Sequence, residues 1–138
     1  METLLKIYCD GGARGNPGPA AAAFVVERQG KIIFKDAKFL GNVTNNVAEY
    51  SAVLFAMEWL SKFSNKVFDE VRFVLDSELV VKQLTGLFKI KNENLRSLYF
   101  SVKEKEEKIP LRISFAAVPR NKNKLADLLV NKVLDENS

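Results

Sequence analysis

The chain of 138 residues is 47% hydrophobic and 28% charged, proportions typical of one globular domain, which we expect to span residues 1–138. Its formal net charge of +4 permits a polyanionic partner without requiring one. The chain contains no histidine, which excludes Ser-His-Asp and Cys-His nucleophile systems and leaves carboxylates, lysines or carboxylate-bound metals for any catalysis.

The first third of the chain is expected to form an antiparallel meander. An apolar run over residues 3–9 predicts a buried strand, after which Asp10 opens a loop rich in glycine and proline. Further strands are predicted over residues 21–27 and 31–40, and a glycine-containing turn at residues 28–30 joins them as a hairpin.

Hydrophobic residues then recur at spacings of three and four, which indicates helices that alternate with strands. The expected elements are helices over residues 46–63, 77–85, 94–108 and 124–134, and strands over residues 71–75 and 111–117. A meander followed by this alternation predicts a mixed α/β fold. Its five-stranded sheet would have an antiparallel beginning and helices on both faces.

Four acidic residues stand at the ends of these elements. Asp10 and Asp76 follow predicted strands, whereas Glu49 and Asp127 lie near predicted helix starts. Because strand ends near the topological switch of such a sheet share one crevice, we expect the four carboxylates to meet. Local interpretations stay open, since Asp10 can start a turn and Asp76 can act as an N-cap. Glu49 can form a capping pair with Asn46, and Asp127 can stabilise a helix dipole.

A cluster of carboxylates is unstable without cations, and hard oxygen ligands suit Mg²⁺ or Mn²⁺. The sequence therefore predicts a metal site. The neighbouring loop GGARGNPGP matches neither of two phosphate-binding patterns, G-x-x-x-x-G-K-[ST] and G-x-G-x-x-G. A strand rather than a helix is predicted to follow it. We therefore do not expect this loop to cradle phosphate.

Four segments carry a resemblance to the type 1 ribonuclease H family, and the last is most similar to its compact archaeal and bacterial members. They occur in the family's order as YCDGGARGNPGPAAAAFVV, TNNVAEYSAVLFAMEWL, VLDSELVVKQLTG and VPRNKNKLADLL. The resemblance implies a ribonuclease H-like fold whose first three strands are antiparallel. It also implies that the same four acids are catalytic and metal-binding: Asp10, Glu49, Asp76 and Asp127.

The activity implied by the resemblance is endonucleolytic hydrolysis of the RNA strand of RNA/DNA hybrids, which leaves 5′-phosphate and 3′-hydroxyl ends. Two ions of Mg²⁺ or Mn²⁺, about 4 Å apart, can drive such hydrolysis without histidine. Asp10 is the expected shared ligand, Glu49 and Asp76 complete one site, and Asp127 completes the other. Contacts to the 2′-hydroxyl would select the RNA strand.

Substrate contacts are also implied by the resemblance. Asn16, Asn45 and Asn46 would lie along the minor groove of the hybrid, and Thr44 would help to hold a phosphate of the DNA strand. The alternative for the asparagines is turn formation or helix capping. Many family members have a histidine where this chain has Arg120, which either contacts phosphate or faces solvent.

Relative to larger members, we expect neither a hybrid-binding module at the N-terminus nor a basic helix between residues 85 and 108. Lys89, Lys91 and Arg96 are candidates to replace that helix, and a solvated face is the alternative. Whether double-stranded RNA or a single ribonucleotide within DNA is also cut stays open.

Three other functions are alternatives: a catalytically silent nucleic-acid-binding module of this fold, a recombination nuclease that cuts DNA, and a small metal- or nucleotide-binding regulator. The order of the four motifs favours ribonuclease H. Cys9 is the single cysteine, which is typical of a reducing, cytoplasmic compartment. No run approaches the roughly 18 apolar residues of a membrane helix, and no signal peptide is expected. We expect a monomer.

Overall fold

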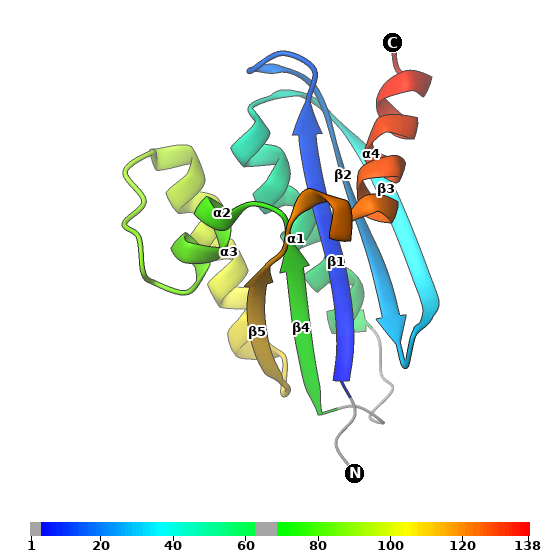
Figure 1. The fold of residues 1–138 in the computed structure, drawn as a ribbon. Coiled ribbons are helices and arrows are strands. Elements are labelled where there is room, and N and C mark those ends of the chain that lie inside the picture. The colour runs from blue at the N-terminus through cyan, green and yellow to red at the C-terminus, as the bar shows by residue number, and fades with distance from the viewer. Residues whose placement is uncertain (1–3, 63–68) are drawn as a thin grey trace.

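The computed structural model describes residues 4–62 and 69–138 and has one five-stranded mixed sheet with the order β3-β2-β1-β4-β5 (Figure 1). The strands are β1 (Leu4–Ala13), β2 (Gly18–Arg28), β3 (Lys31–Val43), β4 (Glu70–Leu75) and β5 (Arg112–Ala117). Strands β1 to β3 pair antiparallel, whereas β4 pairs parallel with β1 and β5 pairs parallel with β4. The predicted fold class is confirmed.

Helices cover both faces of this sheet, as the sequence predicts (Figure 1). They are α1 (Asn45–Lys62), α2 (Glu78–Leu84), α3 (Glu93–Lys108) and α4 (Lys124–Glu136), and a short 3₁₀ helix, η1 (Arg120–Lys122), precedes α4. The larger hydrophobic core joins α1, α2 and α3 to one face of the sheet, and α4 packs on the other face. No helix among the described residues is long and apolar enough to cross a membrane.

Successive side chains of a strand point to opposite faces of the sheet, which explains why hydrophobic residues pack against helices on both faces. Leu5, Ile7 and Cys9 of β1 are buried in the core shared with α1, and the residues between them face the side of α4. On that side, β2 presents the small side chains of Ala21 and Ala23, which pack with residues of α4. Small residues let the helix lie close to the sheet, so the acid-bearing start of α4 is held near β1.

The hairpin between β2 and β3 is confirmed, and its turn is shorter than the three residues predicted. Arg28 still pairs with Lys31, so the turn contains only Gln29 and Gly30. Both have positive φ, 52° and 78°, which is the backbone of the turns that match the twist of paired strands.

The structure corrects the end of the first strand, which was predicted at residue 9. Strand β1 continues to Ala13 because its antiparallel pairing with β2 continues to that residue, whereas its parallel pairing with β4 ends at Tyr8. Asp10 therefore lies within β1, opposite Ala23, rather than in a loop.

The structure also excludes two of the capping roles that the sequence left open as alternatives. Ser77, not Asp76, is the N-cap of α2, and its side chain accepts a hydrogen bond from the Val80 amide. Helix α1 starts at Asn45, and Thr44 Oγ1 accepts a hydrogen bond from the Val47 amide at 3.2 Å, so Asn46 is not the cap.

The remaining predicted boundaries agree with the structure to within three residues at each end. Thr3 and Phe63, which fall in a predicted strand and a predicted helix, lie outside the described residues.

Candidate active site

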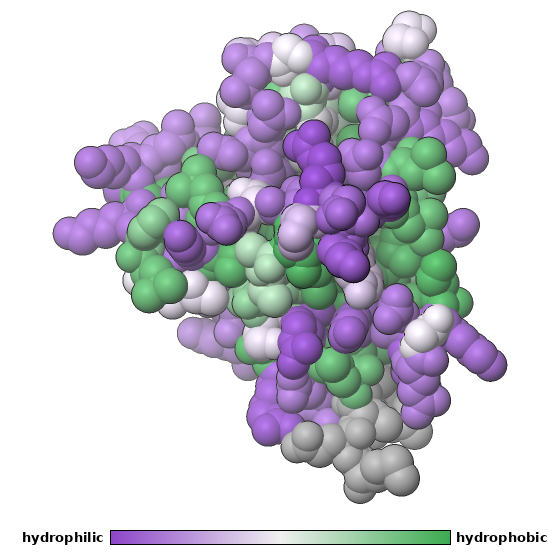
Figure 2. Space-filling view, in the orientation of Figure 1, coloured by the Kyte–Doolittle hydropathy of each residue, from purple (hydrophilic) through white to green (hydrophobic). Residues whose placement is uncertain are grey.

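Four structural elements bring the predicted acids to one hollow at the end of the sheet. Asp10 comes from β1, Glu49 from α1, Asp76 from the residue after β4, and Asp127 from the first turn of α4. All four line a cavity of about 460 Å³. Figure 2 shows mostly hydrophilic side chains over this end of the molecule.

A glycine allows Glu49 to come near Asp10. A Cβ atom on Gly11 would overlap the backbone carbonyl of Ala48 and would lie 2.6 Å from the Glu49 amide nitrogen. Helix α1 therefore packs directly on the backbone of β1, next to Asp10. A side chain at position 11 would push the helix away and separate the two carboxylates.

Asp10, Glu49 and Asp76 hold their protons more tightly than ordinary acids. Burial, followed by the negative charges of Asp76, Asp127 and Glu49, raises the pKa of Asp10 to about 8. Burial also raises the pKa of Glu49 to about 7, although a hydrogen bond from Ser77 opposes the shift. The pKa of Asp76 is raised for the same reason, chiefly burial. The site is thus short of positive charge.

The guanidinium of Arg120 lies beside Asp76. The Nε atom of Arg120 is 3.9 Å from Oδ2 of Asp76, and the Arg120 side chain is 83% exposed. Its positive charge lowers the pKa of Asp76 and of Glu49, which opposes the effect of burial only in part. At this distance the guanidinium does not form a hydrogen bond, so it remains able to contact another anion.

The acids suit divalent cations by their chemistry. Glu49 Oε2 and Asp76 Oδ2 are buried without a hydrogen-bond partner, which is costly for an anion unless a cation completes its environment. Within residues 4–62 and 69–138, no three acidic, histidine or cysteine side chains form a ready-made metal site. The site therefore suits Mg²⁺ or Mn²⁺ through the negative charge of its acids and through oxygens that accept no hydrogen bond, rather than through a preset ligand geometry.

The predicted asparagines line the same cavity, and two of them also hold its rim together. Asn45 Oδ1 accepts a hydrogen bond from the Ala13 amide at 2.8 Å, and Asn16 Oδ1 accepts one from the Asn45 amide at 3.0 Å. These bonds join the loop after β1 to the start of α1. Asn46 lines the cavity as well, whereas Thr44 caps α1 and is not part of the lining.

Three residues at the site were not singled out from the sequence. Arg14 and Asn131 line the cavity, and Arg14 forms an ion pair with Asp135 of α4 at 2.7 Å. Asn123 is buried just before α4 and donates a hydrogen bond to the Cys9 carbonyl at 2.8 Å. The motif N-x-x-A-D contains Asn123, but the contact depends on the packing of α4 and has no local signal.

Arg96, a candidate to replace the basic helix of larger members, is bonded within its own segment. Its guanidinium donates to the Ile90 carbonyl at 3.0 and 3.2 Å. Arg96 thereby shapes the segment between α2 and α3, which exposes Leu87 and Phe88. Lys89 and Lys91 remain predictions as substrate contacts.

Comparison with known proteins places this fold and site in a family. Residues 8–133 match a family model described as reverse transcriptase-like. Ribonuclease HI of Halobacterium salinarum is 39% identical over 130 residues, which cover 94% of this chain and 63% of that protein. A bifunctional protein of Mycobacterium tuberculosis is 35% identical over 131 residues, which cover 94% of this chain and 35% of that protein.

Solved structures give the same result. LC11-RNase H1, isolated from compost and crystallised with an RNA/DNA hybrid, matches with a TM-score of 0.91 and 38% identity over 96% of this chain and 98% of that chain. The chain belongs to the type 1 ribonuclease H family, as its four motifs suggested. It spans less than two thirds of the length of the two curated relatives above.

Proposed function

We propose that this protein is an endoribonuclease that hydrolyses the RNA strand of RNA/DNA hybrids and leaves 5′-phosphate and 3′-hydroxyl ends. The observation that supports this most is the meeting of Asp10, Glu49, Asp76 and Asp127 around one cavity. A pure binding module has no use for an anionic cluster that faces phosphates. The relative crystallised with an RNA/DNA hybrid supports the choice of substrate.

Two divalent cations, Mg²⁺ or Mn²⁺, complete the proposed site. Asp10 would be shared between them, Glu49 and Asp76 would hold one, and Asp127 would hold the other. When bound, such cations lower the pKa of an attacking water and stabilise charge at phosphorus and at the leaving 3′ oxygen. Glu49 Oε2 and Asp76 Oδ2, which are buried and accept no hydrogen bond, support the assignment.

The other side chains around the cavity are proposed to hold the hybrid. The oxygens of Asn16 and Asn45 are bonded to backbone amides, and their NH₂ groups are then the donors that can face a minor groove, together with Asn46. Thr44 Oγ1 accepts from the Val47 amide and can still donate its proton to a DNA phosphate. Arg120 is exposed beside Asp76 and suits an RNA phosphate.

We further propose that residues 1–138 act as one catalytic domain, that the protein is a monomer, and that it works in the cytoplasm. The single sheet that the described strands form, with a hydrophobic cluster on each face, supports one catalytic domain. The single cysteine is a buried free thiol, in keeping with a reducing compartment.

The test is cleavage of an end-labelled RNA strand presented in an RNA/DNA hybrid, in double-stranded RNA and alone. Each substrate is incubated with Mg²⁺, with Mn²⁺ and with chelator. Metal-dependent cutting of the hybrid is expected, and the double-stranded RNA sample shows how strict the choice of duplex is. Hybrid binding without cutting under either metal would instead indicate a catalytically silent module.

A further inference from the structure

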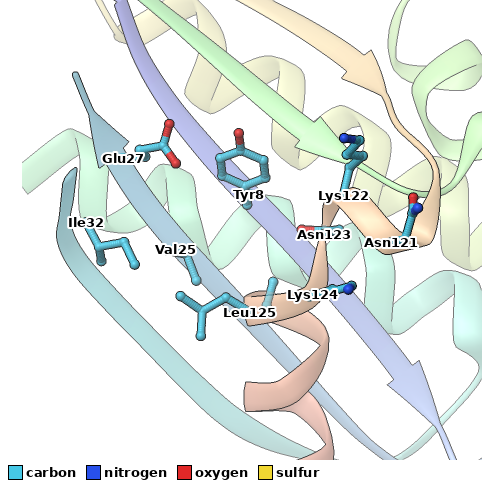
Figure 3. A pocket seen from close by; sticks show the side chains of 10 residues that line it. Tyr8, Val25, Glu27, Ile32, Asn121, Lys122, Asn123, Lys124 and Leu125 are labelled. Carbon is cyan, nitrogen blue, oxygen red and sulfur yellow. The ribbon is translucent and has the colours of Figure 1, made fainter. Parts of the chain in front are cut away.

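Asn123 lies between η1 and α4 and is only 1% exposed. Figure 3 shows it at the start of α4, beside the strand that carries Tyr8, where it lines a second hollow of about 260 Å³. Its Nδ2 atom donates a buried hydrogen bond of 2.8 Å to the carbonyl of Cys9, the residue immediately before Asp10. The side chain therefore fixes the backbone that leads into the central acid.

The same residue is bonded to the helix that carries another acid. The backbone carbonyl of Asn123 accepts a hydrogen bond from the Asp127 amide at 3.2 Å. Asn123 thus connects the strand of Asp10 to the first turn of α4 by two bonds, one from its side chain and one from its backbone.

This arrangement is locally unfavourable for the helix. An asparagine at an N-cap normally accepts a hydrogen bond from a helix amide. Asn92 does so for α3, where its Oδ1 accepts from the Leu95 amide at 3.1 Å. Asn123 makes no such bond for α4, and its Oδ1 is buried with no partner among the described residues.

The cost of an unpaired buried oxygen needs an explanation, because such groups are rare in folded proteins. Local departures from stabilising chemistry are expected at functional sites. Here the Asn123 side chain is turned so that its amide nitrogen reaches the Cys9 carbonyl of β1, and in this orientation its oxygen does not cap α4. Like-charged carboxylates tend to separate when no cation lies between them, and a fixed link between β1 and α4 opposes that separation.

We propose that Asn123 is a positioning residue that sets the placement of Asp127 relative to Asp10 for the binding of divalent cations. The inference rests on the proposed function, because it takes these acids as metal ligands. Groups that orient metal ligands without touching the metal commonly contribute about 10- to 100-fold to metal affinity or activity. The Asn123 side chain is such a group, because it is bonded to the backbone next to Asp10 and lies at the start of the helix that carries Asp127.

The test compares Asn123→Ala with Asn92→Ala, which removes a true helix cap at a distance from the acids. Three quantities are measured: the thermal unfolding midpoint, Mn²⁺ binding by calorimetry without substrate, and kcat and KM for an RNA/DNA hybrid as a function of Mg²⁺ concentration. Asn123→Ala should weaken Mn²⁺ binding and lower kcat by about tenfold or more, with little change in KM for the hybrid. Asn92→Ala should lower the midpoint but leave Mn²⁺ binding and kcat unchanged.

A merely structural role would lower the midpoint in both variants and would leave Mn²⁺ affinity and kcat per folded molecule at wild-type values; that result would overturn the proposal. If Asn123→Ala does not fold, Asn123→Ser, which keeps a short donor, takes its place with the same expected direction. The calorimetry also separates the two proposals. A wild-type protein that binds Mn²⁺ but cuts no hybrid contradicts the proposed function, while the comparison of variants still decides the role of Asn123.

Discussion

Gly11 of β1 lies directly against the backbone of Ala48 in α1, with no room for a side chain between them. This contact sets how close Glu49, the next residue of the helix, comes to Asp10. The separation of two proposed metal ligands is thus governed by a residue that has no functional group.

Replacing Gly11 with alanine should therefore both destabilise the protein and impair its site. The added Cβ overlaps backbone rather than a flexible side chain, so we expect a loss of about 2 kcal/mol in the free energy of unfolding, with a lower kcat. Urea denaturation measures the loss. Gly12→Ala is the matched control, because its Cβ would meet only a Val130 methyl at 3.8 Å. Equal stability of the two variants would contradict the close contact.

The raised pKa values predict how stability depends on pH without metal. Asp10 and Glu49 have pKa values of about 8 and about 7 in the folded protein, against about 4 for ordinary carboxyl groups. The folded state therefore holds protons that the unfolded chain has released, and the free energy of unfolding should fall as pH rises from about 4 to about 8. Mg²⁺ should offset the fall at the upper end.

Thermal unfolding midpoints across this range, with chelator and with Mg²⁺, measure the effect. A midpoint that rises with pH in chelator, or that Mg²⁺ does not raise near pH 8, would contradict the assigned pKa shifts and their cause.

Asp10→Asn should make the metal-free protein more stable. The variant keeps the size of the side chain but removes the charge that burial and the neighbouring acids oppose. In chelator near pH 8, its unfolding midpoint should lie above that of the wild type, and the difference should shrink toward about pH 3, where Asp10 is mostly neutral in both states. A lower midpoint for Asp10→Asn at pH 8 would show that its carboxylate stabilises the fold.

Arg120 is expected to act on substrate rather than on stability. Its side chain is exposed and 3.9 Å from Asp76, so Arg120→Ala should change the free energy of unfolding by only about 0.5 kcal/mol or less. If it contacts a phosphate, the variant should raise KM for the hybrid and reduce the slope of log affinity against log salt by about 1. Wild-type values of both would assign Arg120 to solvent.

The sequence was sufficient to predict the fold class and the meeting of the four acids at one cavity, because strand and helix periodicity and the motifs can be read along the chain. The catalytic roles of these acids stay predictions. The sequence was not sufficient for contacts made by packing. The pairing of β1 with β2 past Asp10 and the bond from Asn123 to Cys9 depend on residues far apart in the chain.

The caps show the same limit at short range. Asn46 and Asp76 are of residue types that are favoured at N-caps. Nearby residues take that role instead: Thr44 caps α1 and Ser77 caps α2. Oδ2 of Asp76 is buried at the cavity and accepts no hydrogen bond, and its neighbour there is Arg120 at 3.9 Å.

The most direct test of the account is cleavage of one RNA/DNA hybrid by the wild type and by Asp10→Asn, with Mg²⁺ and with chelator. Circular dichroism would first verify that both proteins are folded. The account predicts cutting of the RNA strand by the wild type with Mg²⁺ only, and none by the variant. Equal cutting by both proteins, or cutting in chelator, would contradict a metal-dependent site built on Asp10.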